Sequence, residues 1–376
     1  MPELAPLFPV NRRHFEALSD ATGIVQHAVG SVPDPTHGYC TDDVARALTV
    51  DLLHARSLGW AAVEESAWRS LRFLADALEP GPGWFRNCRA VDGAWIAAAG
   101  SEDAQGRAMR ALGEVVLEAP DAAMRALAAA LFEHALPATR ALTALRGRAS
   151  AVLGCDAAMR GGLDGETLRA HRELATGLWA TFEAGAGAQE WPWPEDVLTY
   201  ENALPAQALL VAGQRLGARI VRAGQRALDW LIGIQITPDG HLSPVGNGGW
   251  WPRGGARAQF DQQPIEATAL LLAAEAAHAA TGDDRYARTM ESAYGWFLGQ
   301  NDLGVRLADP ERGACCDGLT RRGANENQGA ESTLMWLIAL ERVRAARPAS
   351  TRVAPVPGAG PRPRPGADGA VRPARD

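Results

Sequence analysis

Segments that open with a polar or acidic cluster and continue as an Ala- and Leu-rich helix recur along this chain. The intervals are regular: Asp43 to Asp103 spans 60 residues, and Glu201 to Glu266 and Glu266 to Glu331 each span 65. A structural unit that repeats along a chain is typical of helical arrays, because each unit buries its apolar face against the next. The helix starts are Thr41-Asp42-Asp43, Ser101-Glu102-Asp103, Tyr200-Glu201-Asn202, Gln263-Pro264-Ile265-Glu266 and 328–332.

A sixth start without an acid is expected in the 98-residue interval between Asp103 and Glu201, on a helix over 140–159. Between these helices lie segments whose apolar residues recur at helical spacing, which indicates an outer ring with one face in water. β-branched runs are scarce, which also favours helices. The outer segments are 64–79, 121–135, 166–184, 219–233 and 283–299, and a helix over 11–19 supplies the twelfth.

The predicted fold is therefore all-α, an (α/α)6 toroid. An open solenoid is the competing geometry, but long loops rich in Trp, Gly and Pro precede the inner helices and favour a closed ring with one functional rim. The toroid is expected to occupy residues 1–346. Residues 347–376 are rich in Pro and Arg and have no apolar periodicity, which predicts a disordered tail.

Charge and composition exclude several classes of protein. The formal net charge of −7 argues against a nucleic-acid partner, which would need a basic surface. No apolar run approaches the roughly 18 residues that span a membrane, and residues 1–10 lack the pattern of an export signal. The five cysteines are scattered and odd in number, which fits reduced thiols in the cytoplasm.

Acids at the starts of several inner helices indicate chemistry at one end of a toroid. Any one of them has a structural explanation, since carboxylates cap helices and complement the helix dipole. A toroid, however, brings these starts together, and carboxyls that share a concave site acquire different pKa values and so different acid and base roles. Glycoside hydrolysis needs such a pair. Asp43 and Asp103 are the leading candidates, followed by Glu201 and Glu266, with Asp42 and Glu102 as the alternatives within each doublet.

Aromatic residues in loops are the second indication. The chain has 12 Trp, and a flat ring with an N–H donor suits the apolar face of a sugar. Trp in helices is better explained as core. The predicted substrate-binding residues are therefore the loop tryptophans and polar or aromatic residues beside the acids: Trp84, Trp95, Trp191, Trp193, Trp250, Trp251, His37, Tyr39, Tyr200 and Gln263.

Other chemistries find little support in the residues. The segment 37–43 contains His, Cys and Asp, but no second cluster at metal-ligand spacing accompanies it, so no metal is expected. The sequence has no Gly-x-Ser-x-Gly elbow, P-loop or Gly-rich strand-to-helix turn, and no cofactor is expected.

Four motifs carry a resemblance to a known family: TGIVQHA at 22–28, GYCTDD at 38–43, GSEDAQGRA at 100–108 and NENQGAESTL at 325–334. Together they resemble the helical carbohydrate-associated region of bacterial glycosyltransferase-like proteins, across most of residues 20–345. That family is similar in architecture to the six-hairpin glycosidases. The chain departs from the family pattern at Val44, where Asn is expected, and at Gln105, where His is expected, so specificity at these positions is open.

The resemblance implies a carbohydrate ligand more firmly than a reaction. The first functional hypothesis is a glycoside hydrolase, with inversion favoured because many such toroids place an acid and a base on opposite sides of the bond. The second is a noncatalytic glycan-binding module beside a separately encoded glycosyltransferase. A sugar epimerase or isomerase ranks lower, because such enzymes usually work with His and no His opens an inner helix.

Overall fold

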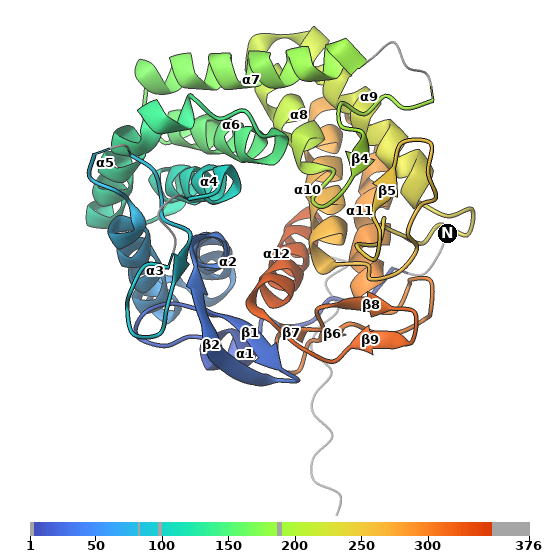
Figure 1. Ribbon diagram of the computed structural model, residues 1–376, viewed down its shortest axis with the longest axis horizontal. Helices are drawn as coiled ribbons and strands as arrows, with labels where there is room; N and C mark the ends of the chain where they lie inside the picture. The colour runs from blue at the N-terminus through green and yellow to red at the C-terminus, as the bar shows by residue number, and fades with distance from the viewer. Residues whose placement is uncertain (1–3, 82, 97–99, 186–189, 348–376) are drawn as a thin grey trace, which may run out of the picture.

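Two concentric rings of helices make up the chain, as Figure 1 shows. The computed structural model describes residues 4–81, 83–96, 100–185 and 190–347. Within these ranges the inner ring consists of α2 (Thr41–Leu58), α4 (Glu102–Glu118), α6 (Leu145–Arg160), α8 (Leu204–Leu216), α10 (Pro264–Thr281) and α12 (Ala330–Ala346). The outer ring consists of α1 (Arg13–Ala17), α3 (Glu64–Ala77), α5 (Ala122–Thr139), α7 (Glu166–Gly185), α9 (Ala218–Gln235) and α11 (Asp284–Phe297).

The two rings differ in how they are buried, and the sequence explains the difference. In α9 the buried residues recur at helical spacing, at Ile220, Ala223, Ala227, Leu228 and Leu231, so that one face meets the inner ring and the other meets water. Inner helices are covered on almost all sides. Their content of Ala, Leu and Gly keeps their side chains short enough for this packing.

Helices α4 and α6 lie unusually close together because glycines line their contact. A Cβ on Gly106 would lie 2.2 Å from the carbonyl oxygen of Gly147, and one on Gly113 would lie 2.1 Å from that of Gly154. The two backbones therefore touch at two levels, with no side chain between them. This contact brings the starts of α4 and α6 together at the rim.

The ring closes where the ends of the chain meet. Helix α12 packs against α2, and the short α1 packs on α12 in the sixth outer position. His14 of α1 shares a hydrogen bond of 2.8 Å between its Nε2 and the carbonyl oxygen of Gln328, and Arg347 donates to the carbonyl oxygen of Ala5 at 2.7 Å. The closed toroid predicted from the sequence is thus confirmed, including the N-terminal helix as its twelfth member.

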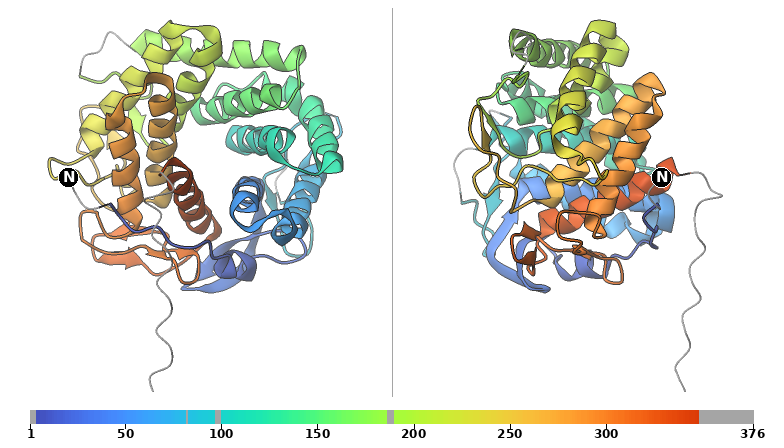
Figure 2. Two further views of the ribbon diagram at one scale, coloured as in Figure 1. Left: turned by 180° about the vertical axis from the view of Figure 1, so that it is seen from behind. Right: turned by 90° about the vertical axis from the view of Figure 1, so that its right-hand side faces the viewer.

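Short strands lie at the rim of the toroid where the inner helices begin, as the right-hand view of Figure 2 shows. Strand β2 runs directly into α2, and β1 pairs with it as an antiparallel hairpin. The other ladders contain two or three residues in each strand. The strands are β1 (Val25–Val29), β2 (Val32–Cys40), β3 (Cys88–Arg89), β4 (Val197–Leu198), β5 (Trp251–Pro252), β6 (Ala308–Asp309), β7 (Ala314–Cys315), β8 (Gly318–Thr320) and β9 (Gly323–Asn325).

These strands were not expected from the sequence. In β2 the first six residues are exposed or half-buried and the last three are buried, so the alternation that identifies a strand is absent. The tail predicted over 347–376 lies outside the described residues except for Arg347, which is buried against Glu291. None of the described helices is both long enough and apolar enough to span a bilayer.

The glycine contact between α4 and α6 predicts a position-specific effect on stability. Gly113→Ala places a Cβ against the Gly154 backbone and is expected to lower the free energy of unfolding by about 2 kcal/mol. Gly233→Ala in α9 is the matched control, because a Cβ there meets nothing within 4 Å and the substitution should stabilise the helix by about 0.5–1 kcal/mol. Urea unfolding measures both. Equal effects at the two positions would contradict the close contact.

Candidate functional site

The starts of the inner helices deliver carboxyl groups to one end of the toroid. Asp42 and Asp43 lie in the first turn of α2, Asp103 in that of α4 and Glu331 in that of α12. Glu201 lies in the turn that precedes α8 and has a positive φ of 47°. These five residues, here called the acid cluster, come from four segments that are far apart in the sequence.

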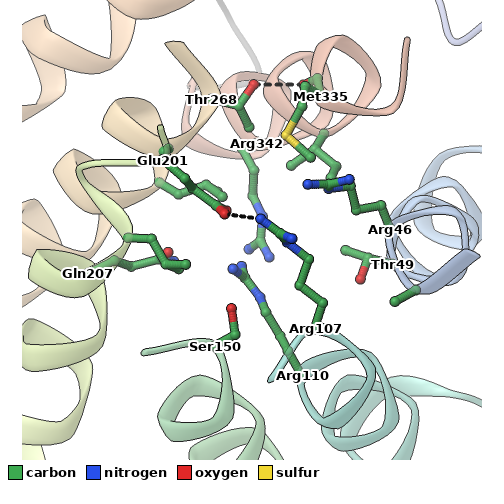
Figure 3. Close-up of a pocket in the computed structure, with 15 residues that line it drawn as sticks. Arg46, Thr49, Arg107, Arg110, Ser150, Glu201, Gln207, Thr268, Met335 and Arg342 are labelled. Carbon is green, nitrogen blue, oxygen red and sulfur yellow. Dashed lines mark hydrogen bonds and ion pairs between the residues drawn. The ribbon is translucent and has the colours of Figure 1, made fainter. Parts of the chain in front are cut away.

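Arg107 of α4 holds three members of the acid cluster together. Its Nη2 donates to Glu201 Oε2 at 2.5 Å (Figure 3), and its Nη1 lies 3.3 Å from Asp42 Oδ1 and 3.7 Å from Asp103 Oδ2. The Arg107 residue is only 9% exposed, so these contacts are formed away from bulk water. Charge interactions are stronger in such surroundings, and the guanidinium therefore joins α2, α4 and the turn before α8.

Arg46 of α2 holds the other two members. Its Nη1 donates to Asp43 Oδ1 at 2.9 Å, and its Nη2 lies 2.9 Å from Glu331 Oε2. This contact bridges α2 and α12, the two helices that close the ring. Arg46 and Arg107 thus contact all five carboxyls of the acid cluster, so the carboxyl groups outnumber the guanidinium groups.

This excess of carboxyls separates their pKa values. Burial raises the pKa of Glu331, the Arg46 charge opposes this rise, and the neighbouring Asp43 adds to it. For Glu201 burial also acts upward, but the charges of Arg107 and Arg46 outweigh it and lower the pKa. Glu331 is also the most exposed member of the acid cluster, with 38% of its side chain accessible. The cluster therefore contains an accessible carboxyl whose pKa is raised and a buried carboxyl whose pKa is lowered.

Asp43, a leading candidate from the sequence, does not lie in the open part of the cluster. It is 5% exposed, and it accepts a hydrogen bond from the Cys40 thiol at 3.1 Å as well as from Arg46. Asp42, its neighbour in the doublet, has 19% of its side chain exposed. Within this doublet the expectation for Asp43 is corrected in favour of Asp42, because successive residues in a helical turn point in different directions.

Glu102 is likewise removed from the candidate set. Its carboxylate accepts hydrogen bonds from the Thr143 backbone N–H at 2.7 Å, from the Ala144 backbone N–H at 2.5 Å and from the Thr143 hydroxyl at 3.0 Å. Both N–H groups lie directly before α6, which begins at Leu145. Glu102 therefore joins the start of α4 to the turn that leads into α6.

Glu266 holds the turn that carries Glu201 and does not itself belong to the acid cluster. It is 3% exposed and accepts hydrogen bonds from the backbone N–H groups of Glu201 and Asn202 and from the Asn202 side chain, the last at 3.0 Å. These bonds hold the turn in which Glu201 takes its left-handed conformation. Burial raises the Glu266 pKa to about 7, against the lowering effect of those donors and of Arg146.

Tyr200 extends the site from the acid cluster toward a loop. Its hydroxyl donates to Asp103 Oδ2 at 2.5 Å, and the Arg146 guanidinium lies 4.5 Å from its ring centre. Trp250 lies 6.4 Å from the same ring, centre to centre, and has a φ of 57°. A left-handed conformation is costly for a bulky residue and is commonly found at functional sites. Among the predicted aromatics, Tyr200 thus contacts an acid of the cluster, and Trp250 lies beside Tyr200.

The remaining loop tryptophans mostly belong to the core. Trp191 and Trp193 are 5% and 2% exposed and pack with Trp230 and Trp251, with ring centres 5.4–6.3 Å apart. The expectation that Trp191 and Trp193 bind substrate is therefore corrected, because neither presents an open ring face. Trp251 is half-buried in the same group, and Trp84 is half-buried against the core. Trp95 packs on Phe73, and the guanidinium groups of Arg86 and Arg89 lie 5.7 and 5.6 Å from its ring centre.

Three polar or aromatic candidates occupy different environments. Tyr39 is 3% exposed and donates its hydroxyl to Asp20, so it is corrected to a core residue. His37 is exposed on β2 and lies edge-on to His27, with ring centres 4.6 Å apart. Gln263 is half-buried directly before α10.

Sequence reasoning missed the arginines and underrated Glu331. A signal was present for both arginines, because Asp43 and Arg46 are three residues apart and Asp103 and Arg107 are four apart, so each pair shares one helix face. Glu331 is absent from the predicted catalytic residues, because capping alone explains an acid at a helix start. Its accessibility depends on how α12 meets α2, which no local pattern encodes.

Comparison with known proteins identifies the fold. No protein-family model and no curated protein matches the sequence. Among solved structures, a D-mannose isomerase aligns with a TM-score of 0.68 and 10% identity over 89% of this chain and 95% of the other. A cellobiose 2-epimerase from Spirochaeta thermophila gives 0.62 and 15% over 86% and 91%. A GH76 α-mannanase from Bacteroides thetaiotaomicron gives 0.60 and 10% over 87% and 91%. At such low identities these matches show the six-hairpin toroid fold alone.

Glu266 makes stability depend on pH in a defined direction. Its folded pKa of about 7 lies above the ordinary value of 4.5, so its contribution is complete at low pH and is lost as the pH rises through 7. Between pH 6 and pH 8 the free energy of unfolding should fall by about 1 kcal/mol through this group. Urea titrations of the wild type and Glu266→Gln at both pH values measure the change. An equal pH dependence in the two proteins would contradict the raised pKa.

Proposed function

We propose that this chain is a carbohydrate-active enzyme that hydrolyses a glycosidic bond at the acid cluster. The observation that carries the proposal is the convergence of Asp42, Asp103 and Glu331, all partly exposed, on one end of the toroid. Hydrolysis of a glycosidic bond needs one carboxyl that gives a proton and another that acts as base or nucleophile. The cluster offers both kinds.

Glu331 is the proposed proton donor, because burial raises its pKa while its side chain remains accessible. Asp42 and Asp103 are the proposed partners that activate water or attack the sugar. Both lie beside the Arg107 guanidinium, with carboxylate oxygens 3.3 and 3.7 Å from its Nη1. Glu201 is committed to Arg107 at 2.5 Å and positions that guanidinium.

Tyr200 and Trp250 are the proposed sugar-binding aromatics. Tyr200 touches Asp103 directly, so a sugar ring on this side of the cluster would lie within reach of the acids. The structural neighbours support a carbohydrate ligand, because they include a D-mannose isomerase, a cellobiose 2-epimerase and an α-mannanase. A reducing, cytoplasmic location is part of the proposal and is supported by five unpaired cysteines.

A noncatalytic glycan-binding module is the second candidate, and one observation favours it. Every carboxyl of the acid cluster contacts Arg46 or Arg107, an arrangement that is stable without any catalytic role. This alternative adds a separately encoded glycosyltransferase as the partner. It predicts saccharide binding without turnover and co-purification with that enzyme.

A panel of α- and β-linked manno- and gluco-oligosaccharides tests the proposal. Turnover by the wild type is expected, with kcat reduced about 100-fold or more in Glu331→Gln and in Asp103→Asn, since each removes a group that transfers a proton or a bond. Trp250→Ala should raise KM more than it lowers kcat. Glu166→Gln is the control, because that carboxyl lies on the outer surface with 57% of its side chain exposed.

The outcomes separate the candidates. Full activity in Glu331→Gln and Asp103→Asn would remove these residues from the mechanism. Binding that is lost in Trp250→Ala, with no turnover of any substrate by the wild type, would favour the noncatalytic module. Conversion of mannose or cellobiose to an isomer would instead identify an epimerase or isomerase.

A further inference from the structure

A small cavity continues from the acid cluster into the centre of the toroid. Its volume is about 40 Å³, and residues from all six inner helices line it. Four of the lining residues are arginines, namely Arg46, Arg107, Arg110 and Arg342, and Glu201 is the one lining carboxylate among the described residues. Figure 3 shows the guanidinium groups of Arg107, Arg110 and Arg342 directed into the same space.

Arg110 and Arg342 have hydrogen-bond donors that the protein leaves free. Arg110 donates its Nε to Glu114 Oε1 at 3.1 Å, and its two Nη groups have no hydrogen-bond partner among the described residues. Arg342 makes no hydrogen bond within that part of the chain, and its closest carboxylate oxygen, on Glu275, is 3.7 Å away. Its Nε is buried without a partner. Buried donors without acceptors are costly and uncommon in folded proteins.

Gln207 of α8 gives a second, independent indication. It lines the cavity and is 8% exposed, yet its Oε1 is buried without a hydrogen-bond partner in the described structure. The amide can turn to present either its oxygen or its N–H₂ group, so it can also donate. Glu201 cannot satisfy these groups alone, because its carboxylate already binds Arg107 at 2.5 Å.

We propose that this cavity binds one oxyanion group, a phosphate or a carboxylate, between Arg110, Arg342 and Gln207. Guanidinium groups form short, paired hydrogen bonds with such oxygens, and the surrounding low dielectric strengthens them. A cavity of about 40 Å³ suits a group of a few heavy atoms. The site is argued from its own donors and does not require the proposed hydrolysis.

The anion has two sources that the chemistry does not separate. It can be free inorganic phosphate, or it can be the charged group of a sugar phosphate or uronate whose ring lies above, among the acid cluster. Isothermal titration of the full chain at low salt with inorganic phosphate, mannose 6-phosphate and glucuronate distinguishes these sources. Tightest binding of phosphate alone identifies the free ion, and tighter binding of either sugar identifies a substrate group.

Substitutions locate the site. Arg110→Gln and Arg342→Gln are each expected to weaken binding of the tightest of these three anions by at least 10-fold, whereas Arg226→Gln, on the outer surface, leaves it unchanged. Gln207→Glu keeps the side-chain shape and supplies a carboxylate to the free guanidinium groups. It should abolish anion binding and raise the melting temperature of the ligand-free protein.

Two results would overturn the proposal. One is the absence of millimolar binding by all three anions to a folded wild-type protein. The other is binding that Arg110→Gln, Arg342→Gln and Gln207→Glu leave unchanged while circular dichroism confirms that each variant is folded. Neither readout uses oligosaccharide turnover, so failure of the proposed hydrolysis and failure of the anion site are observed separately.

Discussion

The contacts of Arg107 and Arg46 with the acid cluster are the constraint on which the functional end of this toroid depends. Each inner helix favours an acid at its start, because the helix dipole and the free N–H groups stabilise negative charge there. Closing the ring then brings several of these acids together, where they repel one another. Two buried guanidinium groups offset that repulsion and also join α2, α4, α12 and the turn before α8.

Other contacts arrange the backbone so that the acids can reach Arg107 and Arg46. The glycines between α4 and α6 bring their starts together, and Glu102 holds the turn that leads into α6. Glu266 holds the turn that directs Glu201 toward Arg107. Of the six acids proposed from the sequence, Glu102 and Glu266 therefore act on the backbone. The open part of the cluster is left to Asp42, Asp103 and Glu331.

The fold could be read from the sequence because its signals are local and periodic. The spacing of the acidic starts predicted the positions of the inner helices, and helical amphipathicity predicted those of the outer helices. Both agree with the observed bounds to within a few residues. The acid-rich end of the toroid could also be predicted, because a closed ring brings the N-terminal ends of its inner helices to the same rim. The strands escaped prediction, because most ladders contain only two or three residues and the longer β2 lacks the alternation of a half-buried strand.

The individual roles in the site could not be read in the same way. Whether Trp191 or Trp250 has a free ring face depends on Trp230 and Tyr200, which lie on other segments. Whether Asp42 or Asp43 is accessible depends on the rotation of α2 against its neighbours. The cationic cavity below the cluster requires arginines from α4 and α12 to meet, and their positions in the sequence give no sign of this.

The functional end of the toroid depends on energetic coupling between Arg107 and the carboxyls it contacts. A double-mutant cycle with Arg107→Met, Glu201→Gln and the double variant, followed by urea unfolding at pH 7, measures this coupling directly. We expect a coupling energy of about 1.5–3 kcal/mol, because the contact is charge-assisted and buried. Effects that add to within about 0.5 kcal/mol would contradict it, since the two side chains would then be independent.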